Sequence, residues 1–151
     1  MKLQRTLETA PAFADFPPDV LEMLGRSMVL RAYPDGEDLV VEGEPARRLL
    51  LIVSGEVEVW SRDTSRRRKT LVNLGPGDLF GVIALVDGST RTATATATGK
   101  VEVAELPASA FTMLYESDSP VSVHFQLLIA RQLARDARRV NEALRAQSKQ
   151  A

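Results

Sequence analysis

The residues whose types and spacing favour chemistry lie between Leu74 and Ala95. Gly81 directly precedes an apolar run, residues 82–86, that is long enough for one or two helical turns. A glycine before a helix lets backbone N–H groups converge on an anion, helped by the helix dipole. Arg91 follows inside an otherwise uncharged stretch, and its planar fork of donors suits a phosphate. The pattern therefore predicts a cradle for a phosphate-bearing ligand.

The elements that must position this cradle are short β segments between Met28 and Leu106. Residues 49–53 are apolar throughout, which predicts a strand covered on both faces. Residues 56–60 alternate, which predicts a strand with one wet face, and Gly55 is interpreted as a break between these two strands. Thr and Ala alternate over residues 90–98, which predicts a further strand. Short strands punctuated by Gly and Pro favour an antiparallel sandwich or barrel.

Helical patterns flank the β region on both sides. A helix is expected to start at Pro18 or Asp19 and to stop at Gly25. A short helix is expected after Pro107, and a long one over residues 121–147 with Ser119 as its N-cap. The chain thus divides into an N-terminal helical segment (1–27), a β-roll (28–106) with a phosphate-binding cassette (80–94), and C-terminal helices (107–151), all in one domain.

Composition excludes several classes of protein. The chain has 151 residues, which suits one domain. Its formal net charge of -1 argues against a protein that binds nucleic acid over its whole surface. It has no cysteine and a single histidine, His124, so thiol catalysis, zinc fingers and metal sites that need two imidazoles are excluded. No apolar run approaches the roughly 18 residues of a membrane span, and no signal-peptide core is visible. A cytoplasmic protein with no membrane association, no metal and no cofactor is expected.

The cassette carries a specific resemblance. Phe80-Gly81-Val82-Ile83-Ala84-Leu85, followed by Arg91-Thr92-Ala93-Thr94, is similar to the pattern F-G-E-x-A-L … R-(S/T/A)-A-T of the cyclic-nucleotide-binding domain family. This is the module of bacterial catabolite-activator-type regulators and of regulatory subunits of cAMP-dependent protein kinase. The turn 75–78 matches as well, and the likeness spans about residues 13–147. It implies a mainly β fold, an antiparallel sandwich or jelly-roll barrel flanked by an N-terminal helix and C-terminal helices, the last one long.

The resemblance also implies a ligand and the residues that hold it. Arg91 would pair with the phosphate oxygens of cAMP or cGMP, and the amides of Ile83 and Ala84 would add donors. Thr92 would lie near the phosphate or the purine. The implied ligand-binding residues are Leu74, Gly81, Val82, Ile83, Ala84, Arg91, Thr92 and Ala93.

Val82 departs from the family pattern. The family's glutamate at this position accepts a hydrogen bond from the ribose 2′-hydroxyl, and valine has no acceptor. Burying that hydroxyl unpaired costs about 1–3 kcal/mol, so affinity would fall roughly 5- to 150-fold. The alternative function is therefore a degenerate domain with no nucleotide ligand that acts as a dimerisation or adaptor module.

The long C-terminal helix has two interpretations. Its apolar stripe either covers its own domain as a lid or pairs with a second copy in a homodimer, and the length of the stripe favours pairing. Direct DNA binding is not expected, because the chain ends at Ala151 without a helix-turn-helix segment. The basic cluster Arg66–Lys69, with Arg62 close by, is interpreted as a solvated hairpin loop.

The function predicted from the sequence is a regulatory sensor module, not an enzyme. A small phosphate-bearing ligand would bind through Arg91, and binding would be relayed to the C-terminal helix. Catalysis of the kind found in β-barrel metalloenzymes is not expected, because such sites use two or three histidines.

Overall fold

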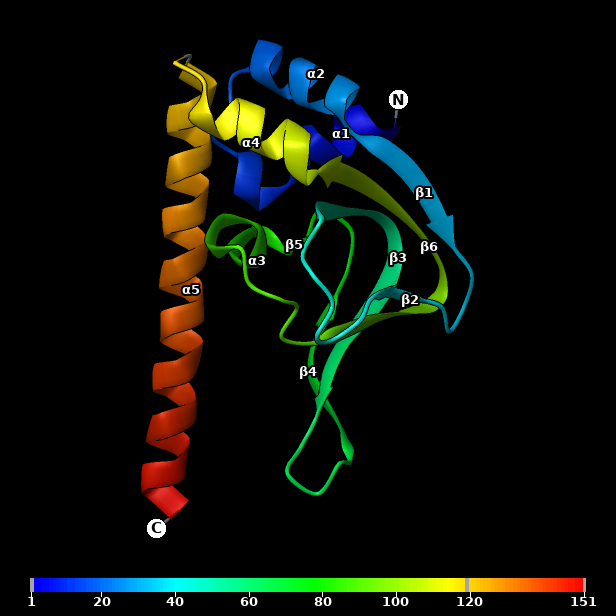
Figure 1. Ribbon diagram of the computed structural model, residues 1–151, viewed down its shortest axis with the longest axis vertical. Coiled ribbons are helices and arrows are strands. Elements are labelled where there is room, and N and C mark those ends of the chain that lie inside the picture. The colour runs from blue at the N-terminus through cyan, green and yellow to red at the C-terminus, as the bar shows by residue number, and fades with distance from the viewer. Residues whose placement is uncertain (1, 119, 151) are drawn as a thin grey trace.

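The computed structural model describes residues 2–118 and 120–150 and contains a rolled antiparallel sheet with helices before and after it in the chain (Figure 1). The helices are α1 (Lys2–Thr9), the 3-10 helix η1 (Pro11–Phe13), α2 (Pro18–Ser27), α3 (Val82–Asp87), α4 (Ala108–Glu116) and α5 (Pro120–Gln150). The strands are β1 (Val29–Tyr33), β2 (Asp38–Val40), β3 (Arg48–Arg62), β4 (Arg68–Leu74), β5 (Leu79–Phe80) and β6 (Thr94–Pro107). The expected fold, an antiparallel β structure with flanking helices and a long last helix, is confirmed.

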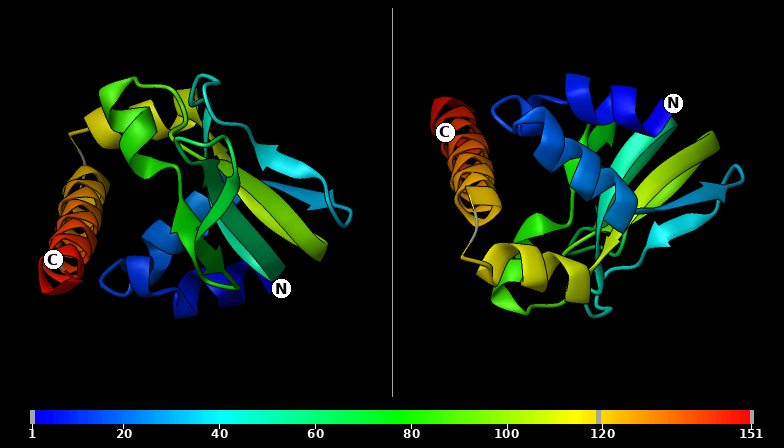
Figure 2. Two further views of the ribbon diagram at one scale, coloured as in Figure 1. Left: turned by 90° about the horizontal axis from the view of Figure 1, so that it is seen from below. Right: turned by 90° about the horizontal axis from the view of Figure 1, so that it is seen from above.

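The sheet is built on two long strands, β3 and β6. Its order is β1-β6-β3-β4, with β2 added on β6 and β5 added on β3, and every pairing is antiparallel. Both end-on views show the sheet curling rather than lying flat (Figure 2). Helices α1, α2 and α4 gather at one end of the roll, and α5 runs along one side (Figure 1). The concave side of the roll is therefore left facing α3 and α5.

Gly55 does not separate two strands, contrary to the sequence expectation. It lies inside the single strand β3, with a φ of 89°, where the pairing with β6 shifts register between Ser54 and Glu56. A Cβ at Gly55 would lie 2.5 Å from the carbonyl oxygen of Lys100. Glycine is needed here because the strand bends and the neighbouring backbone approaches closely, so the residue marks a bulge rather than a turn.

The run over residues 49–53 is buried on both faces, as expected. Leu49 and Leu51 pack into the core beneath the helices, whereas Leu50 and Ile52 pack into a second core inside the roll. Because side chains alternate along a strand, one apolar run serves both cores. This strand therefore joins the helical end of the molecule to the roll.

Aromatic rings hold the N-terminal and C-terminal helices together. Phe16 lies 5.1 Å from Phe13 and 5.4 Å from Phe125, and Phe111 lies 5.6 Å from Phe125, measured between ring centroids, all edge to face. Phe125 is fully buried. The start of α5 is thus fixed against its own domain. Ser119, the expected N-cap of this helix, lies outside the described residues.

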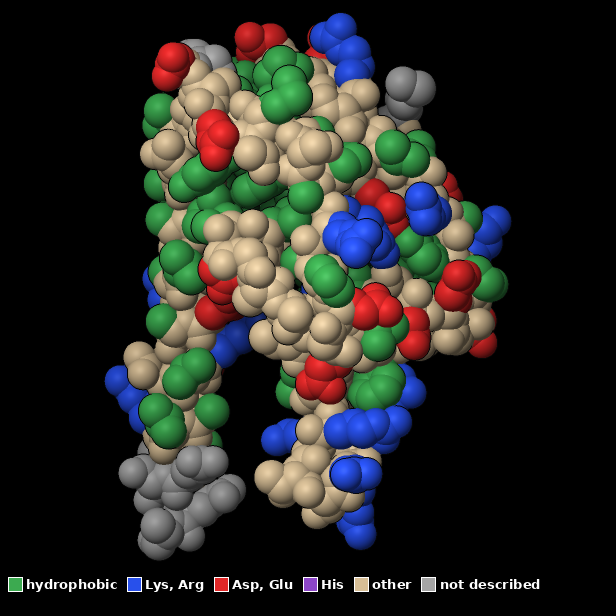
Figure 3. All heavy atoms as spheres, viewed as in Figure 1, with side chains coloured by type: hydrophobic (Ala, Val, Ile, Leu, Met, Phe, Trp, Pro, Cys, Tyr) green, Lys and Arg blue, Asp and Glu red, His purple; other side chains and the backbone are tan. Residues whose placement is uncertain are grey.

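The rest of α5 leaves the domain surface. Ile129 is buried, but further along the apolar stripe Leu133, Val140 and Leu144 are 50%, 58% and 57% exposed. The space-filling view shows the lower part of α5 standing apart from the body (Figure 3). The helix therefore has a packed first part and an exposed second part.

Candidate functional site

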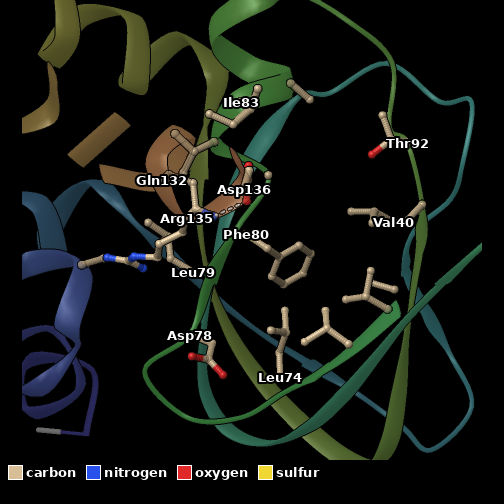
Figure 4. Close-up of a pocket in the computed structure, with 18 of the residues that line it drawn as sticks. Val40, Leu74, Asp78, Leu79, Phe80, Ile83, Thr92, Gln132, Arg135 and Asp136 are labelled. Carbon is tan, nitrogen blue, oxygen red and sulfur yellow. Dashed lines mark hydrogen bonds between the residues drawn. The ribbon is translucent and has the colours of Figure 1, made fainter. Parts of the chain in front are cut away.

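A cavity of about 290 Å³ lies between the roll, α3 and α5. The end of β4, β5 and the loop before β6 form its walls, and polar side chains of α5 line it from the other side (Figure 4). The lining is mostly apolar with a few polar groups, as is usual for small-molecule sites. The cavity is large enough for a molecule of nucleotide size.

The cavity brings together all eight residues nominated from the sequence. Leu74 ends β4, Gly81 joins β5 to α3, and Arg91 lies in the loop before β6. The lining of the cavity includes each ligand-binding residue predicted from the sequence: Leu74, Gly81, Val82, Ile83, Ala84, Arg91, Thr92 and Ala93.

Gly81 has a conformation and a neighbour that exclude a side chain. Its φ is 90° and it caps the start of α3, a region that residues with a Cβ avoid. A Cβ here would lie 2.4 Å from Nη1 of Arg91. The glycine is thus required both by the turn into α3 and by the guanidinium packed against it.

Arg91 is buried, with 6% of its surface exposed. Its Nη2 donates to the carbonyl oxygen of Arg48 at 2.6 Å, and its Nη1 donates to that of Gly81 at 3.4 Å. The backbone of Arg91 is also fixed, because its N–H donates to Glu44 and its carbonyl accepts from Gly43. Burial, and then the charge of Arg48, lower the pKa of Arg91 from its ordinary value. The arginine is therefore a desolvated cation with main-chain acceptors and no carboxylate partner among the described residues.

The strand expected over residues 90–98 is wrong for its first part. The β6 strand begins at Thr94, and Arg91 lies in the preceding loop. In this loop the chain exchanges hydrogen bonds with residues 43 and 44 instead of a neighbouring strand. Leaving the sheet allows the side chain of Arg91 to turn toward Gly81.

Val82 is 2% exposed and packs into the core beneath the helices while it lines the cavity. Among the described lining residues the carboxylates are Asp78 and Asp136. One oxygen of Asp78 accepts from the N–H of Gly75 at 2.8 Å, and Asp136 accepts from Nε2 of Gln132 at 3.1 Å. Both carboxylates are already hydrogen-bonded within the protein.

Sequence reasoning missed two parts of the lining. One is the apolar wall of the roll, made by Val40, Val59, Val72 and Phe80. The other is the face of α5 that carries Gln132, Arg135, Asp136 and Arg139. Successive members of this set are three, one and three residues apart, which places them on one side of a helix. This spacing would have predicted a polar helix face from the sequence.

A buried network lies behind Arg91. The side chain of Arg48, whose carbonyl oxygen holds Arg91, pairs through Nε with Glu105 at 3.1 Å. Glu105 also accepts from the hydroxyl of Tyr33 and pairs with Arg31 at 3.6 Å. Burial and the hydrogen bond to Glu105 raise the pKa of Tyr33. Arg48 therefore contributes its main-chain oxygen to Arg91 and its side chain to a network of ion pairs.

Two further features were sought among the described residues: clusters of metal ligands and membrane-spanning helices. No group of three or more His, Cys, Asp or Glu side chains among the described residues is arranged to hold a metal ion. None of the described helices is both long and apolar enough to cross a bilayer.

Comparisons with known proteins agree with this geometry. The family model of the cyclic nucleotide-binding domain matches residues 30–118. A CRP-like cAMP-activated global transcriptional regulator of Mycobacterium tuberculosis is 32% identical over 142 residues, covering 94% of this chain and 62% of the relative. The chain therefore spans about three fifths of that relative's length.

Solved structures give the same result. The catabolite activator protein of Thermus thermophilus matches with a TM-score of 0.82 and 28% identity, covering 91% of this chain and 63% of that one. The N-terminal domain of a transcriptional regulator from Streptomyces coelicolor A3(2) matches with a TM-score of 0.77 and 27% identity, covering 87% of this chain and 94% of that one.

Proposed function

Because the chain belongs to the cyclic nucleotide-binding domain family, we propose that it is a sensor module that binds cAMP or cGMP through Arg91 and relays binding to α5. The Mycobacterium relative is named as cAMP-activated, which favours the cyclic nucleotide as ligand class. The Mycobacterium and Streptomyces relatives are both named as transcriptional regulators, and the proposal includes no catalytic step.

The observation that carries the proposal is the environment of Arg91. A guanidinium with 6% exposure beside an apolar cavity is costly unless an anion balances it. Two carbonyl oxygens satisfy some of its five N–H donors but neutralise none of its charge. A phosphodiester would supply the missing negative charge and accept a charge-assisted hydrogen-bonded pair.

The relay to α5 is supported by the lining of the cavity. Gln132, Arg135, Asp136 and Arg139 of α5 share the cavity with Arg91. A ligand that contacts both sides stabilises the arrangement in which they lie close. A tenfold preference for that arrangement corresponds to about 1.4 kcal/mol of coupling.

Calorimetry tests the proposal directly. Purified protein is titrated with cAMP and cGMP and compared with an Arg91→Ala variant. The matched control is Arg47→Ala, which removes an exposed arginine close in sequence to Arg48. We expect the control to bind like wild type and Arg91→Ala to lose at least tenfold in affinity. Equal heats for wild type and Arg91→Ala would overturn the role of Arg91.

A second candidate function is a dimerisation or adaptor module that needs no ligand. Two observations favour it: the missing acceptor at Val82, and the exposed apolar side chains Leu133, Val140 and Leu144 on one helix. In this function α5 pairs with α5 of a second copy. Light scattering, which measures the mass, and thermal unfolding, which measures the melting temperature, distinguish the two candidates. An adaptor keeps both values with or without nucleotide.

A further inference from the structure

We propose that the β3–β4 hairpin is a docking surface for the phosphate backbone of double-stranded DNA. The hairpin tip is defined here as residues 62–69, which join β3 to β4. It contains five basic residues and one acidic residue, in a chain whose formal net charge is -1. From the sequence alone this cluster is expected to be a solvated loop. The proposal is independent of the nucleotide cavity.

The hairpin tip carries cations that the protein does not neutralise. Arg68 pairs with Glu58. In the part of the chain that the structure describes, Arg66, Arg67 and Lys69 form no ion pair. All three are exposed. They therefore concentrate positive charge at one place on a nearly neutral molecule.

Hydrogen bonds within the chain shape the hairpin tip. The carboxylate of Asp63 accepts from the N–H groups of Ser65 at 2.8 Å and Arg67 at 2.9 Å. The backbone N–H of Asp63 donates to the carbonyl oxygen of Arg67 at 2.9 Å. The carboxylate of Asp63, the one acidic residue of the hairpin tip, is thus used to shape the turn. A preformed turn lowers the ordering cost of binding.

The shape of the hairpin suits a DNA groove. It projects from the body as a narrow two-stranded ribbon (Figure 1), and its surface is dominated by Lys and Arg (Figure 3). The major groove of B-DNA is roughly 12 Å wide and admits such a ribbon, whereas the major groove of A-form RNA is too narrow.

Residue types on the hairpin tip favour phosphate over other anionic partners. Four of its five basic residues are arginines, which bind phosphate oxygens bidentately. Thr64 and Ser65 add hydroxyl donors, which commonly contact the DNA backbone. Residues 61–70 include no apolar side chain, so nothing there would insert into a lipid bilayer.

The exposed part of α5 also carries basic side chains. It points in the same direction as the hairpin (Figure 1), and Arg138 and Arg145 lie on it and are exposed. A duplex lying across the end of the molecule would meet basic side chains from both elements.

Fluorescence anisotropy with a labelled 30-bp duplex of arbitrary sequence tests the proposal at several KCl concentrations. The test variant is Arg67→Glu/Lys69→Glu. The matched control is Arg5→Glu/Arg26→Glu, which makes the same charge change on two exposed arginines of α1 and α2, at the opposite end of the molecule (Figure 1). Circular dichroism checks that both variants fold.

We expect wild type and control to bind with a Kd of about 10 µM near 100 mM salt, and the test variant to bind at least tenfold more weakly. The slope of log K against log [KCl] should be shallower by about 2 in the test variant, since two phosphate contacts are lost. Equal losses in both variants, or no binding by wild type, would overturn the proposal. Tighter binding of a labelled poly-glutamate peptide than of the duplex would instead assign the surface to an acidic polypeptide.

Discussion

Gly81 and Arg91 constrain each other at the scale of single atoms. Both were predicted from the sequence, because a glycine before an apolar turn and an isolated arginine are unusual enough to be informative. Their mutual contact was not predictable, since it depends on how the loop before β6 leaves the sheet. Nor did the sequence indicate that the partners of Arg91 within the chain would be main-chain oxygens.

A methyl group at Gly81 should impair binding more than folding. Gly81→Ala meets a φ of 90° and places a Cβ 2.4 Å from Nη1 of Arg91. We expect the unfolding free energy to fall by about 1–2 kcal/mol from the backbone alone, and nucleotide affinity to fall because Arg91 is displaced. Gly36→Ala is the control, since Gly36 has a φ of 82° but nothing within 4 Å of a Cβ. Calorimetry showing equal affinity losses for the two variants would contradict this prediction.

Val82 should make the site disfavour a ligand that carries the ribose 2′-hydroxyl. The residue is buried and has no acceptor, and the nearby carboxylates Asp78 and Asp136 already accept hydrogen bonds from the protein. We expect 2′-deoxy-cAMP to bind roughly 5- to 150-fold more tightly than cAMP, because the hydroxyl of cAMP loses its hydrogen bonds to water on burial and gains no acceptor, which costs about 1–3 kcal/mol. Competition binding with the two compounds measures the ratio. A tenfold preference for cAMP would mean that another group accepts from the hydroxyl.

Tyr33 should make folding stability sensitive to alkaline pH. Burial and the hydrogen bond to Glu105 raise its pKa above the ordinary value of 10.0. The folded state therefore holds the proton more tightly than the unfolded state does. This contribution is fully present below pH 10 and is lost as the pH rises through the folded-state pKa. Urea unfolding between pH 8 and 11.5 should show a steeper loss for wild type than for Tyr33→Phe, and parallel curves would refute the assignment.

At the scale of elements, the two cores explain which predictions succeeded. Residues 49–53 were predictable as a strand covered on both faces because every position is apolar. Alternate side chains of this strand pack into the two cores. Gly55 was misread because a glycine has the same sequence signature in a turn and in a bulge. The polar face of α5 could be derived from its spacing, but its position at the cavity depends on how the whole helix packs against the domain, which no local pattern specifies.

The two parts of α5 should respond differently to truncation of a side chain. Phe125 is fully buried against Phe16 and Phe111, whereas Leu144 is 57% exposed. Phe125→Ala should lower the unfolding free energy by about 3–5 kcal/mol. Leu144→Ala should change it by less than about 0.5 kcal/mol in dilute, monomeric protein. Denaturant titration measures both, and a large loss for Leu144→Ala would indicate that the end of α5 is packed.

For the whole molecule, ligand binding should appear as thermal stabilisation. A nucleotide that binds only the folded state stabilises it by about 2.7 kcal/mol at 100 times its Kd. For a domain of 151 residues this corresponds to a rise in Tm of roughly 5–10 °C. Differential scanning fluorimetry with cAMP and cGMP measures the shift. A tenfold weaker Arg91→Ala variant should be stabilised by only about 1.4 kcal/mol at the same ligand concentration, roughly half of the wild-type shift, and an equal shift in that variant would place the ligand elsewhere.

The overall organisation was more predictable than its details. The order of helical, β and helical segments follows from changes in periodicity, so it was predicted. The separation of α5 into a docked part and a free part was not, because its apolar stripe continues through both. From the sequence alone the same stripe fits burial against the domain or pairing with a second copy, and its length favours pairing.

The main-chain acceptors of Arg91 have a consequence for how this protein tolerates mutation. The oxygen that Arg48 offers belongs to the backbone, so replacing the side chain there leaves the acceptor in place as long as β3 keeps its path. A carboxylate anchor is lost when its residue is replaced, whereas the main-chain oxygen of Arg48 remains when its side chain is replaced. Gly81 is the exception, because a Cβ there would lie 2.4 Å from Nη1 of Arg91. Substitutions of side chains that line the cavity would therefore change ligand selectivity before they change the position of the Arg91 guanidinium.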